Sequence, residues 1–109
     1  MTTLTLKHWF MIMSDTLTFD RTYIFFDGRV VLRDFYQDDI KLTMGYMAKG
    51  EFKWLADKTE RFTIVSGLAN FIFDGKIIPA EPGSIITVPE GKTFTVHVSE
   101  PIDYRCYYG

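Results

Sequence analysis

Short apolar runs separated by turn signals dominate the sequence from Arg21 onward. Pairs such as Asp27-Gly28 and Asp74-Gly75 are typical of tight hairpin turns, and the runs between them are rich in the β-branched and aromatic residues that favour strands. We expect strands at residues 23–26, 29–35, 41–48, 51–55, 61–65, 68–73, 76–79, 84–88, 93–98 and 102–108. No window of about 11 residues without Gly or Pro has a helical period, so the chain is predicted to be all-β.

Apolar and polar residues alternate along the later runs, as they do in strands with one buried face. The apolar parity is expected to point inward, and its members are Phe62, Ile64, Phe94, Val96, Val98, Tyr104, Cys106 and Tyr108. The other parity is expected to face solvent or a partner subunit, and its members are Arg61, Thr63, Thr95, His97, Arg105 and Tyr107. Many short strands with this alternation predict a sandwich or a barrel.

The size and the charge of the chain exclude several classes of protein. Its 109 residues fit one domain, and a hydrophobic content of 47% favours a continuous core over disorder. A net charge of -2 gives no basic surface for nucleic acid, and no apolar run reaches the roughly 20 residues that a membrane-spanning helix needs. Cys106 is the single cysteine, which excludes an intrachain disulfide. We therefore expect a cytoplasmic protein without nucleic-acid or membrane partners.

The N-terminal residues do not share the pattern of the rest. We predict an N-terminal extension at residues 1–18, part of which is dispensable because Met13 is a second candidate start, and one domain at residues 19–109. The alternative is that the extension adds a strand to the edge of the sheet. Its apolar stretch, residues 9–13, is shorter than the apolar segment of a secretory signal peptide, which supports the cytoplasmic prediction.

A glycine motif near the C-terminus narrows the choice of barrel. Gly83 is followed after five residues by Pro89-Glu-Gly91, which matches the second cupin motif: a turn, a short buried strand, and a second turn. Glu60 stands seven positions before Gly67, as do the glutamate and the final glycine of the first cupin motif. The two motifs in this order predict a single-domain cupin, a jelly-roll β-barrel.

The ligand positions of a metal-binding cupin are occupied by other residues here. Trp54-Leu55-Ala56 stands where the His-x-His pair would be, and Phe94 stands where a third histidine belongs. A transition metal typically needs three or four nitrogen, oxygen or sulfur ligands, and Glu60 alone does not supply them. We therefore expect no metal site, and we reject a metal-dependent dioxygenase or isomerase.

Several motifs resemble the pyrimidine/purine nucleoside phosphorylase family of small bacterial cupins. The resemblance covers about residue 21 to the C-terminus. The residues that carry it are Gly45-Tyr-Met-Ala-Lys-Gly50-Glu51-Phe52, Glu60 through Thr63-Ile-Val-Ser66-Gly67, Asn70, Pro82-Gly83-Ser84, Val88-Pro89, Phe94, Glu100-Pro101 and Tyr104-Arg-Cys106-Tyr-Tyr108. The chain departs from the family in its N-terminal extension and in a shortened loop around Asp74 to Ile78. It also departs at Thr95 and Tyr107, which stand where relatives can carry His and Arg.

The resemblance implies a reaction in which inorganic phosphate replaces the base of a purine or pyrimidine nucleoside. The products are the free base and ribose 1-phosphate, and neither a metal nor an organic cofactor takes part. Such a site needs cationic or N–H donors for phosphate, acceptors for the ribose hydroxyls, and a surface on which the base stacks.

Candidate residues follow from this chemistry. Glu60 and Glu51 are the expected catalytic carboxylates, which bind ribose hydroxyls or stabilise positive charge on the sugar. Lys41 stands where the family has a basic residue and is expected to bind phosphate, although a solvated strand lysine fits the position equally well. Arg61 and Arg105 are alternatives for phosphate if a partner subunit covers their face.

Aromatic residues are the other candidates for substrate binding. Trp54 and Phe94 either form the wall for the base or fill the volume of the absent metal site. Tyr46, Tyr104 and Tyr108 carry hydroxyls for the base or the phosphate, although most tyrosines in such barrels serve packing.

Two other functions compete with the phosphorylase. A metal-free cupin can bind a small ligand without catalysis, in which case the ligand shifts the melting temperature but is not consumed. A structural oligomer is the weakest alternative, because it depends only on the aromatic content. In each case we expect a homodimer, because a cupin barrel leaves sheet edges and apolar faces to be covered.

Overall fold

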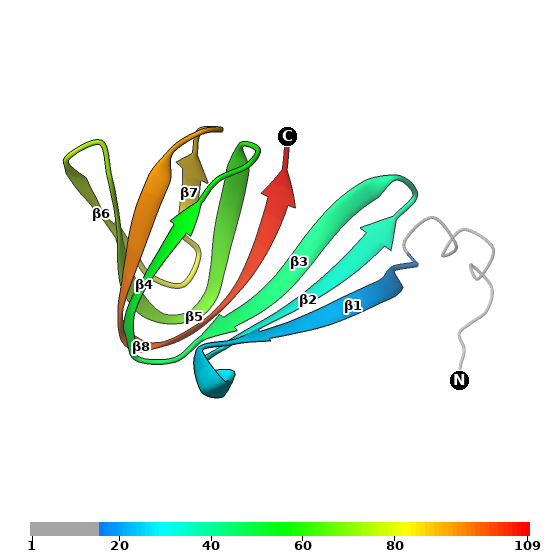
Figure 1. The fold of residues 1–109 in the computed structure, drawn as a ribbon, viewed down its shortest axis with the longest axis horizontal. Helices are drawn as coiled ribbons and strands as arrows, with labels where there is room; N and C mark the ends of the chain where they lie inside the picture. The colour runs from blue at the N-terminus through cyan, green and yellow to red at the C-terminus, as the bar shows by residue number, and fades with distance from the viewer. Residues whose placement is uncertain (1–15) are drawn as a thin grey trace.

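The computed structural model describes residues 16–109, and they form an all-β domain as predicted (Figure 1). The strands are β1 (Thr18–Phe25), β2 (Val30–Gln37), β3 (Ile40–Met47), β4 (Gly50–Leu55), β5 (Glu60–Phe73), β6 (Lys76–Ala80), β7 (Ile85–Val88) and β8 (Thr93–Tyr108), with one 3-10 turn, η2 (Phe26–Gly28). No helix in residues 16–109 is long and apolar enough to span a bilayer. The predicted extension lies almost wholly outside the described residues, so the division at residue 18 stays a prediction.

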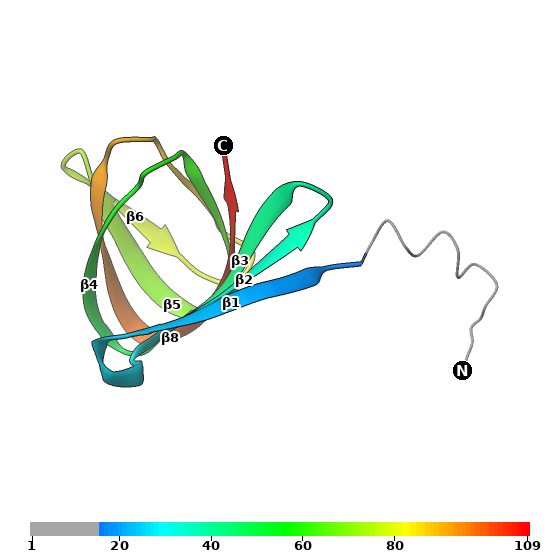
Figure 2. The ribbon, with the colours of Figure 1, turned by 45° about the vertical axis from the view of Figure 1, so that its right-hand side comes forward.

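All the strands pair antiparallel in one sheet of order β1-β2-β3-β8-β5-β6, with β4 also paired to β8 and β7 also paired to β5. The long strands β5 and β8 bend, so that β4 to β8 curl around a common interior. The first three strands extend away from this interior as a ribbon (Figure 2). We call β4 to β8 the closed end, and β1 to β3 the arm.

Two pairs of predicted strands are single bent strands. Residues 61–65 and 68–73 both belong to β5, and residues 93–98 and 102–108 both belong to β8. The pairing of β5 with β8 shifts register repeatedly between Ile64 and Ala69, where bulges bend the strand without ending it. Gly67 has φ +92, and a Cβ there would collide with the carbonyl of Pro101, so this bend requires glycine.

The turn between β1 and β2 also differs from its predicted form. Asp27-Gly28 does mark the hairpin, but the connection is the 3-10 turn η2 instead of a two-residue loop. Phe26 and Asp27 take φ values of 53° and 56°, which non-glycine residues rarely adopt, so strand β1 ends at Phe25, one residue before the predicted end.

The predicted faces of the sheet are confirmed. Every residue expected to point inward is buried except Tyr108, which is half-buried, and every residue expected to point outward is exposed or half-buried. Phe62, Phe71 and Phe94 form the centre of the core, with ring centroids 5.0 to 6.2 Å apart. This aromatic cluster occupies the closed end and leaves the interior nearer the arm for a cavity.

Candidate active site

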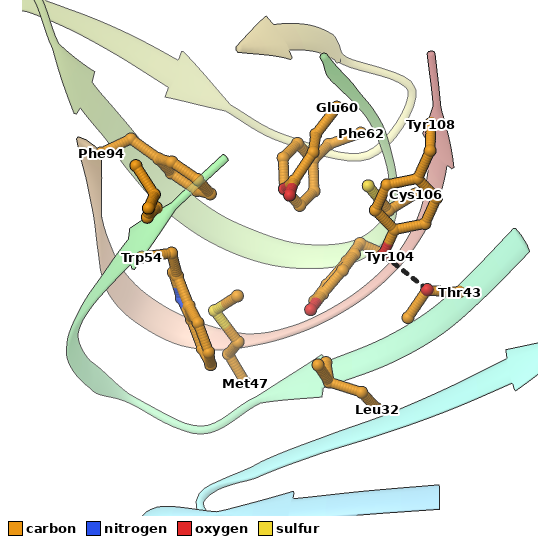
Figure 3. A pocket seen from close by; sticks show the side chains of 11 residues that line it. Leu32, Thr43, Met47, Trp54, Glu60, Phe62, Phe94, Tyr104, Cys106 and Tyr108 are labelled. Atoms are coloured by element: carbon orange, nitrogen blue, oxygen red, sulfur yellow. Dashed lines mark hydrogen bonds between the residues drawn. The ribbon is translucent and has the colours of Figure 1, made fainter. Parts of the chain in front are cut away.

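An inner cavity of about 80 Å³ lies inside the barrel, between the aromatic core and the arm (Figure 3). Its lining residues come from the arm and from the closed end, and they are Leu32, Thr43, Met47, Trp54, Leu55, Glu60, Phe62, Phe94, Tyr104, Cys106 and Tyr108. Most of this wall is apolar or aromatic. Its polar groups are few, which is typical of a pocket that fixes the orientation of a ligand.

A wider outer pocket of about 600 Å³ adjoins the inner cavity. It contains five charged side chains, namely Asp39, Lys41, Asp57, Lys58 and Glu60, together with Tyr36, Ile40, Tyr108 and the C-terminal Gly109. Glu60 and Tyr108 line both spaces, and they are directly paired across β5 and β8. These two residues therefore mark the boundary at which a ligand would pass from charged to apolar surroundings.

Glu60 has an unusual protonation equilibrium. Burial, followed by the negative charge of Asp57, raises the pKa of Glu60 to about 7, while the positive charge of Lys41 acts in the opposite direction. A carboxyl group with a pKa near neutrality can both hold and release a proton under physiological conditions, which is the property required of a general acid or base.

A buried polar chain runs from the arm to the last strand. Asp34 is only 4% exposed, and its Oδ1 accepts a hydrogen bond of 2.7 Å from Thr43 Oγ1. Thr43 Oγ1 is 2.6 Å from the hydroxyl of Tyr108. At the outer pocket, Lys41 Nζ lies 3.5 Å from Asp34 Oδ2 and 4.7 Å from the centre of the Tyr108 ring. Asp34 thus holds the threonine and the lysine in fixed positions on the wall of the site.

Trp54 presents an unused donor. Its indole nitrogen is buried and has no hydrogen-bond partner among residues 16–109. Buried donors in native proteins are nearly always paired, so a lone one on a cavity wall is a candidate contact for an acceptor of the ligand. The side chain itself is held by edge contacts with Phe25 and Phe26, at 5.7 and 5.8 Å between ring centres.

Most of the predicted site residues come together at the cavity. Trp54, Glu60, Phe94, Tyr104 and Tyr108 line the inner space, and Lys41 lines the outer pocket. Trp54, Glu60 and Phe94, which mark the ligand positions of a metal-binding cupin, therefore line the same cavity. In residues 16–109, no three His, Cys, Asp or Glu residues gather in a group that could hold a metal ion.

Glu51 and Tyr46 lie elsewhere, so the expectation that Glu51 is near the cavity is wrong. Glu51 is exposed on the outer face of β4, opposite His97, because its neighbour Phe52 takes the inward position. Tyr46 is half-buried and alternates with Gly45 and Met47, which face the interior, so its ring lies on the other face of β3. Neither residue lines either space.

The outer face also carries the residues that depart from the family. Tyr107 is half-buried there, with the guanidinium of Arg61 5.2 Å from its ring centre, and Thr95 is half-buried on the same side of β8. Arg105 is exposed on this face as well. None of the four lines the inner cavity or the outer pocket of this single chain.

Asp34 and Thr43 are the site residues that sequence reasoning missed. Asp34 shares the inward parity of Val30 and Leu32 in an otherwise apolar run, and a carboxylate on the buried side of a strand is a recognisable signal. Thr43 gives no comparable signal. It becomes significant only through the register that pairs it with both Asp34 and Cys106.

The model of the family described as pyrimidine/purine nucleoside phosphorylase matches residues 20–108 of this chain. A protein of that name from Geobacter sp. (strain M21) is 32% identical over 88 residues, which cover 78% of this chain and 85% of the relative. A protein of the same name from Escherichia coli (strain ATCC 8739) is 29% identical over 89 residues, which cover 77% of this chain and 93% of the relative.

Solved structures support the fold. A DUF1255 protein of unknown function from Acinetobacter sp. ADP1 superposes with a TM-score of 0.80 at 23% identity, covering 87% of this chain and 96% of that one. A cupin superfamily protein from Desulfitobacterium hafniense DCB-2 superposes with a TM-score of 0.65 at 17% identity, covering 76% of this chain and 79% of that one. The predicted cupin architecture is confirmed by these neighbours.

Proposed function

The chain belongs to the pyrimidine/purine nucleoside phosphorylase family, and from this premise we propose that it cleaves purine and pyrimidine nucleosides with phosphate. The observation that carries the proposal is the position of Glu60 between an aromatic cavity and a charged pocket that contains Lys41. This arrangement offers separate surroundings for an apolar base and for an anion, with a titratable carboxyl group between them.

In our proposal, the base enters the aromatic inner cavity and stacks against Trp54 or Phe94. The indole N–H of Trp54 donates to a carbonyl or ring nitrogen of the base. The sugar lies at the boundary, beside Glu60 and Tyr108. Phosphate then occupies the outer pocket, where Lys41 and Lys58 provide positive charge. The negative charges of Asp39 and Asp57 offset part of this positive charge.

The reaction places a proton on the departing base and releases one from the hydrogen phosphate. A phosphate oxygen forms a bond to the anomeric carbon of the sugar while the bond from that carbon to the base nitrogen breaks, and its electron pair passes to the base. Glu60, protonated at the start, gives its proton to the departing base, and the proton released by the hydrogen phosphate returns Glu60 to its acid form. Lys41 stabilises the phosphate throughout. The products are ribose 1-phosphate and the free base.

The test is phosphate-dependent release of base from uridine, inosine, adenosine and guanosine, with and without EDTA. Glu60→Gln keeps the size and most hydrogen bonds of the side chain but has no proton to give, so we expect kcat to fall by about 10²- to 10⁴-fold. Cleavage of 7-methylguanosine, whose base is already cationic, should be affected much less. Glu51→Gln, on the outer face, is the matched control and should keep normal turnover.

The results also separate this proposal from its main competitor. Nucleosides that raise the melting temperature without being consumed would indicate a ligand-binding cupin. An equal loss on 7-methylguanosine and on guanosine would show that Glu60 acts otherwise than as a proton donor. Lys41→Met should raise the KM for phosphate more than that for the nucleoside, whereas equal changes would remove Lys41 from the phosphate site.

We also propose that two chains pair through the arm. Within residues 16–109, strand β1 lies at the edge of the sheet with all eight of its residues exposed, and Phe19 and Ile24 are 54% and 66% exposed. An apolar edge strand left uncovered promotes association. Light scattering at micromolar concentration should give the mass of a dimer, and Ile24→Asp should give a monomer. A monomeric wild-type protein would rule the pairing out.

A further inference from the structure

Three side chains of the candidate site form a hydrogen-bonded chain whose direction can be determined. Thr43 Oγ1 lies 2.7 Å from Asp34 Oδ1. On its other side it lies 2.6 Å from the Tyr108 hydroxyl, the contact that the dashed line in Figure 3 marks. Asp34 and Thr43 are 4% and 1% exposed, so little solvent reaches these two groups. The three residues come from three adjacent strands, β2, β3 and β8.

The carboxylate at the start of the chain sets the direction of both bonds. A carboxylate only accepts hydrogen bonds, so Thr43 donates its single hydroxyl proton to Asp34 Oδ1. Thr43 then has none left for Tyr108, and the contact of 2.6 Å between their oxygens requires Tyr108 to be the donor. Lys41 at 3.5 Å from the other carboxylate oxygen stabilises the charge that maintains this order.

The phenol at the other end is left with acceptor capacity only. Its proton is engaged by Thr43, and burial raises the pKa of Tyr108, so the group does not ionise near neutrality. The Cys106 thiol also neighbours the phenol, but its proton is directed to the carbonyl of Tyr107, with 3.7 Å between Sγ and O. A lone pair on the phenolic oxygen therefore remains for a ligand. Tyr108 lines both the inner cavity and the outer pocket, next to Glu60 on the neighbouring strand.

We propose that Tyr108 accepts a hydrogen bond from a ribose hydroxyl of the nucleoside, and that Asp34, acting through Thr43, fixes it as an acceptor. The assignment to the sugar rests on the proposed function, which locates the sugar at the boundary between the two spaces. Asp34 and Thr43 are positioning residues in this account, and Tyr108 is the residue that determines specificity. An unprotonated phosphate oxygen is a poor occupant of this position, because it would place its lone pairs against those of Tyr108.

This proposal predicts discrimination by donor capacity. A ribonucleoside offers a hydroxyl proton to Tyr108, a deoxynucleoside offers nothing, and a fluoro analogue is similar in size but has no proton to donate. Binding should be compared by calorimetry without phosphate, so that the effect of fluorine on the glycosidic bond does not enter. Deoxyuridine and fluorodeoxyuridine are tested in two series, one modified at the 2′ position and one at the 3′ position. In one of the two series, we expect wild-type protein to bind uridine about five- to tenfold more tightly than either analogue.

Asp34→Asn should reverse the direction of both hydrogen bonds, between positions 34 and 43 and between Thr43 and Tyr108. The amide oxygen will face the ammonium of Lys41, which directs the amide NH₂ toward Thr43. Thr43 then donates to Tyr108, and Tyr108 presents its proton to the ligand. The variant should still prefer uridine to the deoxynucleoside, because the hydroxyl also accepts, but its preference over the fluoro analogue should fall to about twofold or less.

Further variants separate direction from folding. Thr43→Ser retains the hydroxyl and both hydrogen bonds, and it should retain the wild-type preference for uridine over the two analogues. Tyr108→Phe should bind all members of the series about equally. An unchanged preference over the fluoro analogue in Asp34→Asn would overturn the proposal even if that variant were less stable, because a stability loss weakens all ligands alike.

Neutron diffraction from the free protein tests the direction without any ligand. Deuterium on Thr43 pointing to Asp34, and on Tyr108 pointing to Thr43, is the expected result, and the opposite arrangement would overturn the proposal. If the direction is as expected but deoxynucleosides and ribonucleosides bind equally, the sugar assignment is wrong while the phosphorylase proposal stands. If no nucleoside binds, the proposed function fails and the sugar assignment fails with it, but the neutron result still decides the direction.

Discussion

The closed end and the arm belong to the same sheet but bury very different side chains. In the closed end, Phe62, Phe71 and Phe94 are packed ring against ring and are at most 3% exposed. In the arm, every residue of β1 is exposed, and the inward face of β2 and β3 carries Asp34 and Thr43. The residues that stabilise the fold and the polar residues of the candidate site therefore lie in different parts of the barrel. The aromatic core stabilises the sheet, and the arm contributes polar groups whose burial in an apolar core would be unfavourable.

The largest difference between the two regions should appear when a core ring is removed. Phe71 is fully buried, so Phe71→Ala should lower the free energy of unfolding by about 3–5 kcal/mol through lost burial and the cavity left behind. Urea unfolding followed by circular dichroism measures the loss. A cost below about 1 kcal/mol would mean that the closed end does not dominate the stability of the domain.

The junction between the two regions should be the next most sensitive. Gly45 of β3 packs directly against the ring of Tyr104, and a Cβ at this position would overlap the ring. Gly45→Ala should therefore cost about 1–3 kcal/mol in unfolding free energy and should push Tyr104 into the inner cavity. Weaker nucleoside binding together with lower stability is the expected result. Wild-type values for both would show that Tyr104 can move aside freely.

Glu60, at the boundary between the inner cavity and the outer pocket, makes the stability of the domain sensitive to pH. Its carboxyl group ionises at about 4.5 in the unfolded chain but only at about 7 in the folded one, so between these values the unfolded state binds fewer protons. Stability therefore falls as pH rises from about 4.5 to 7. Glu60→Gln removes this pH-dependent loss of stability. Because Glu60 is only half-buried beside the outer pocket, solvent screening limits the gain in the free energy of unfolding to about 1–2 kcal/mol.

Unfolding curves at pH 4 and pH 8 measure the effect of Glu60. The Glu60→Gln variant should match the wild type at pH 4 and should exceed it at pH 8. The same measurements on Glu51→Gln serve as the control, because Glu51 is exposed on the outer face. Equal stability of Glu60→Gln and wild type at pH 8 would contradict a raised pKa at position 60.

The same contrast explains which features the sequence could predict. Strands, their faces and the cupin architecture follow from alternation and from the Gly83 to Gly91 motif, which act within a single run of residues. The unbroken course of β5 could not be read in this way, because Ser66-Gly67 has the composition of a turn although it forms a bulge.

Some residues of the candidate site could likewise be predicted from a local motif, and others could not. Glu60 was predictable because a local motif contains it. Thr43 was not, because its role depends on the register of β2, β3 and β8, and register is a long-range property. The error at Glu51 has a simpler cause: the burial of Phe52 determines the facing of its neighbour, and strict alternation would have placed Glu51 outside.

The smallest effect is expected at the far edge of the arm. Phe19 has the same side chain as Phe71 but is 54% exposed and touches Phe35 only edge-on, with ring centres 5.7 Å apart. In dilute protein, where a dimer would dissociate, Phe19→Ala should cost about 0.5 kcal/mol or less.

Repeating the Phe19→Ala measurement at high protein concentration tests whether a second chain covers the Phe19 ring. If two chains pair through β1, the wild-type melting temperature rises with concentration and that of Phe19→Ala rises less, because the ring is then buried by the partner. Phe71→Ala should lower the melting temperature by a similar amount at every concentration, since its contacts lie within one chain. A melting temperature independent of concentration for all three proteins would show that no second chain covers Phe19 on the arm.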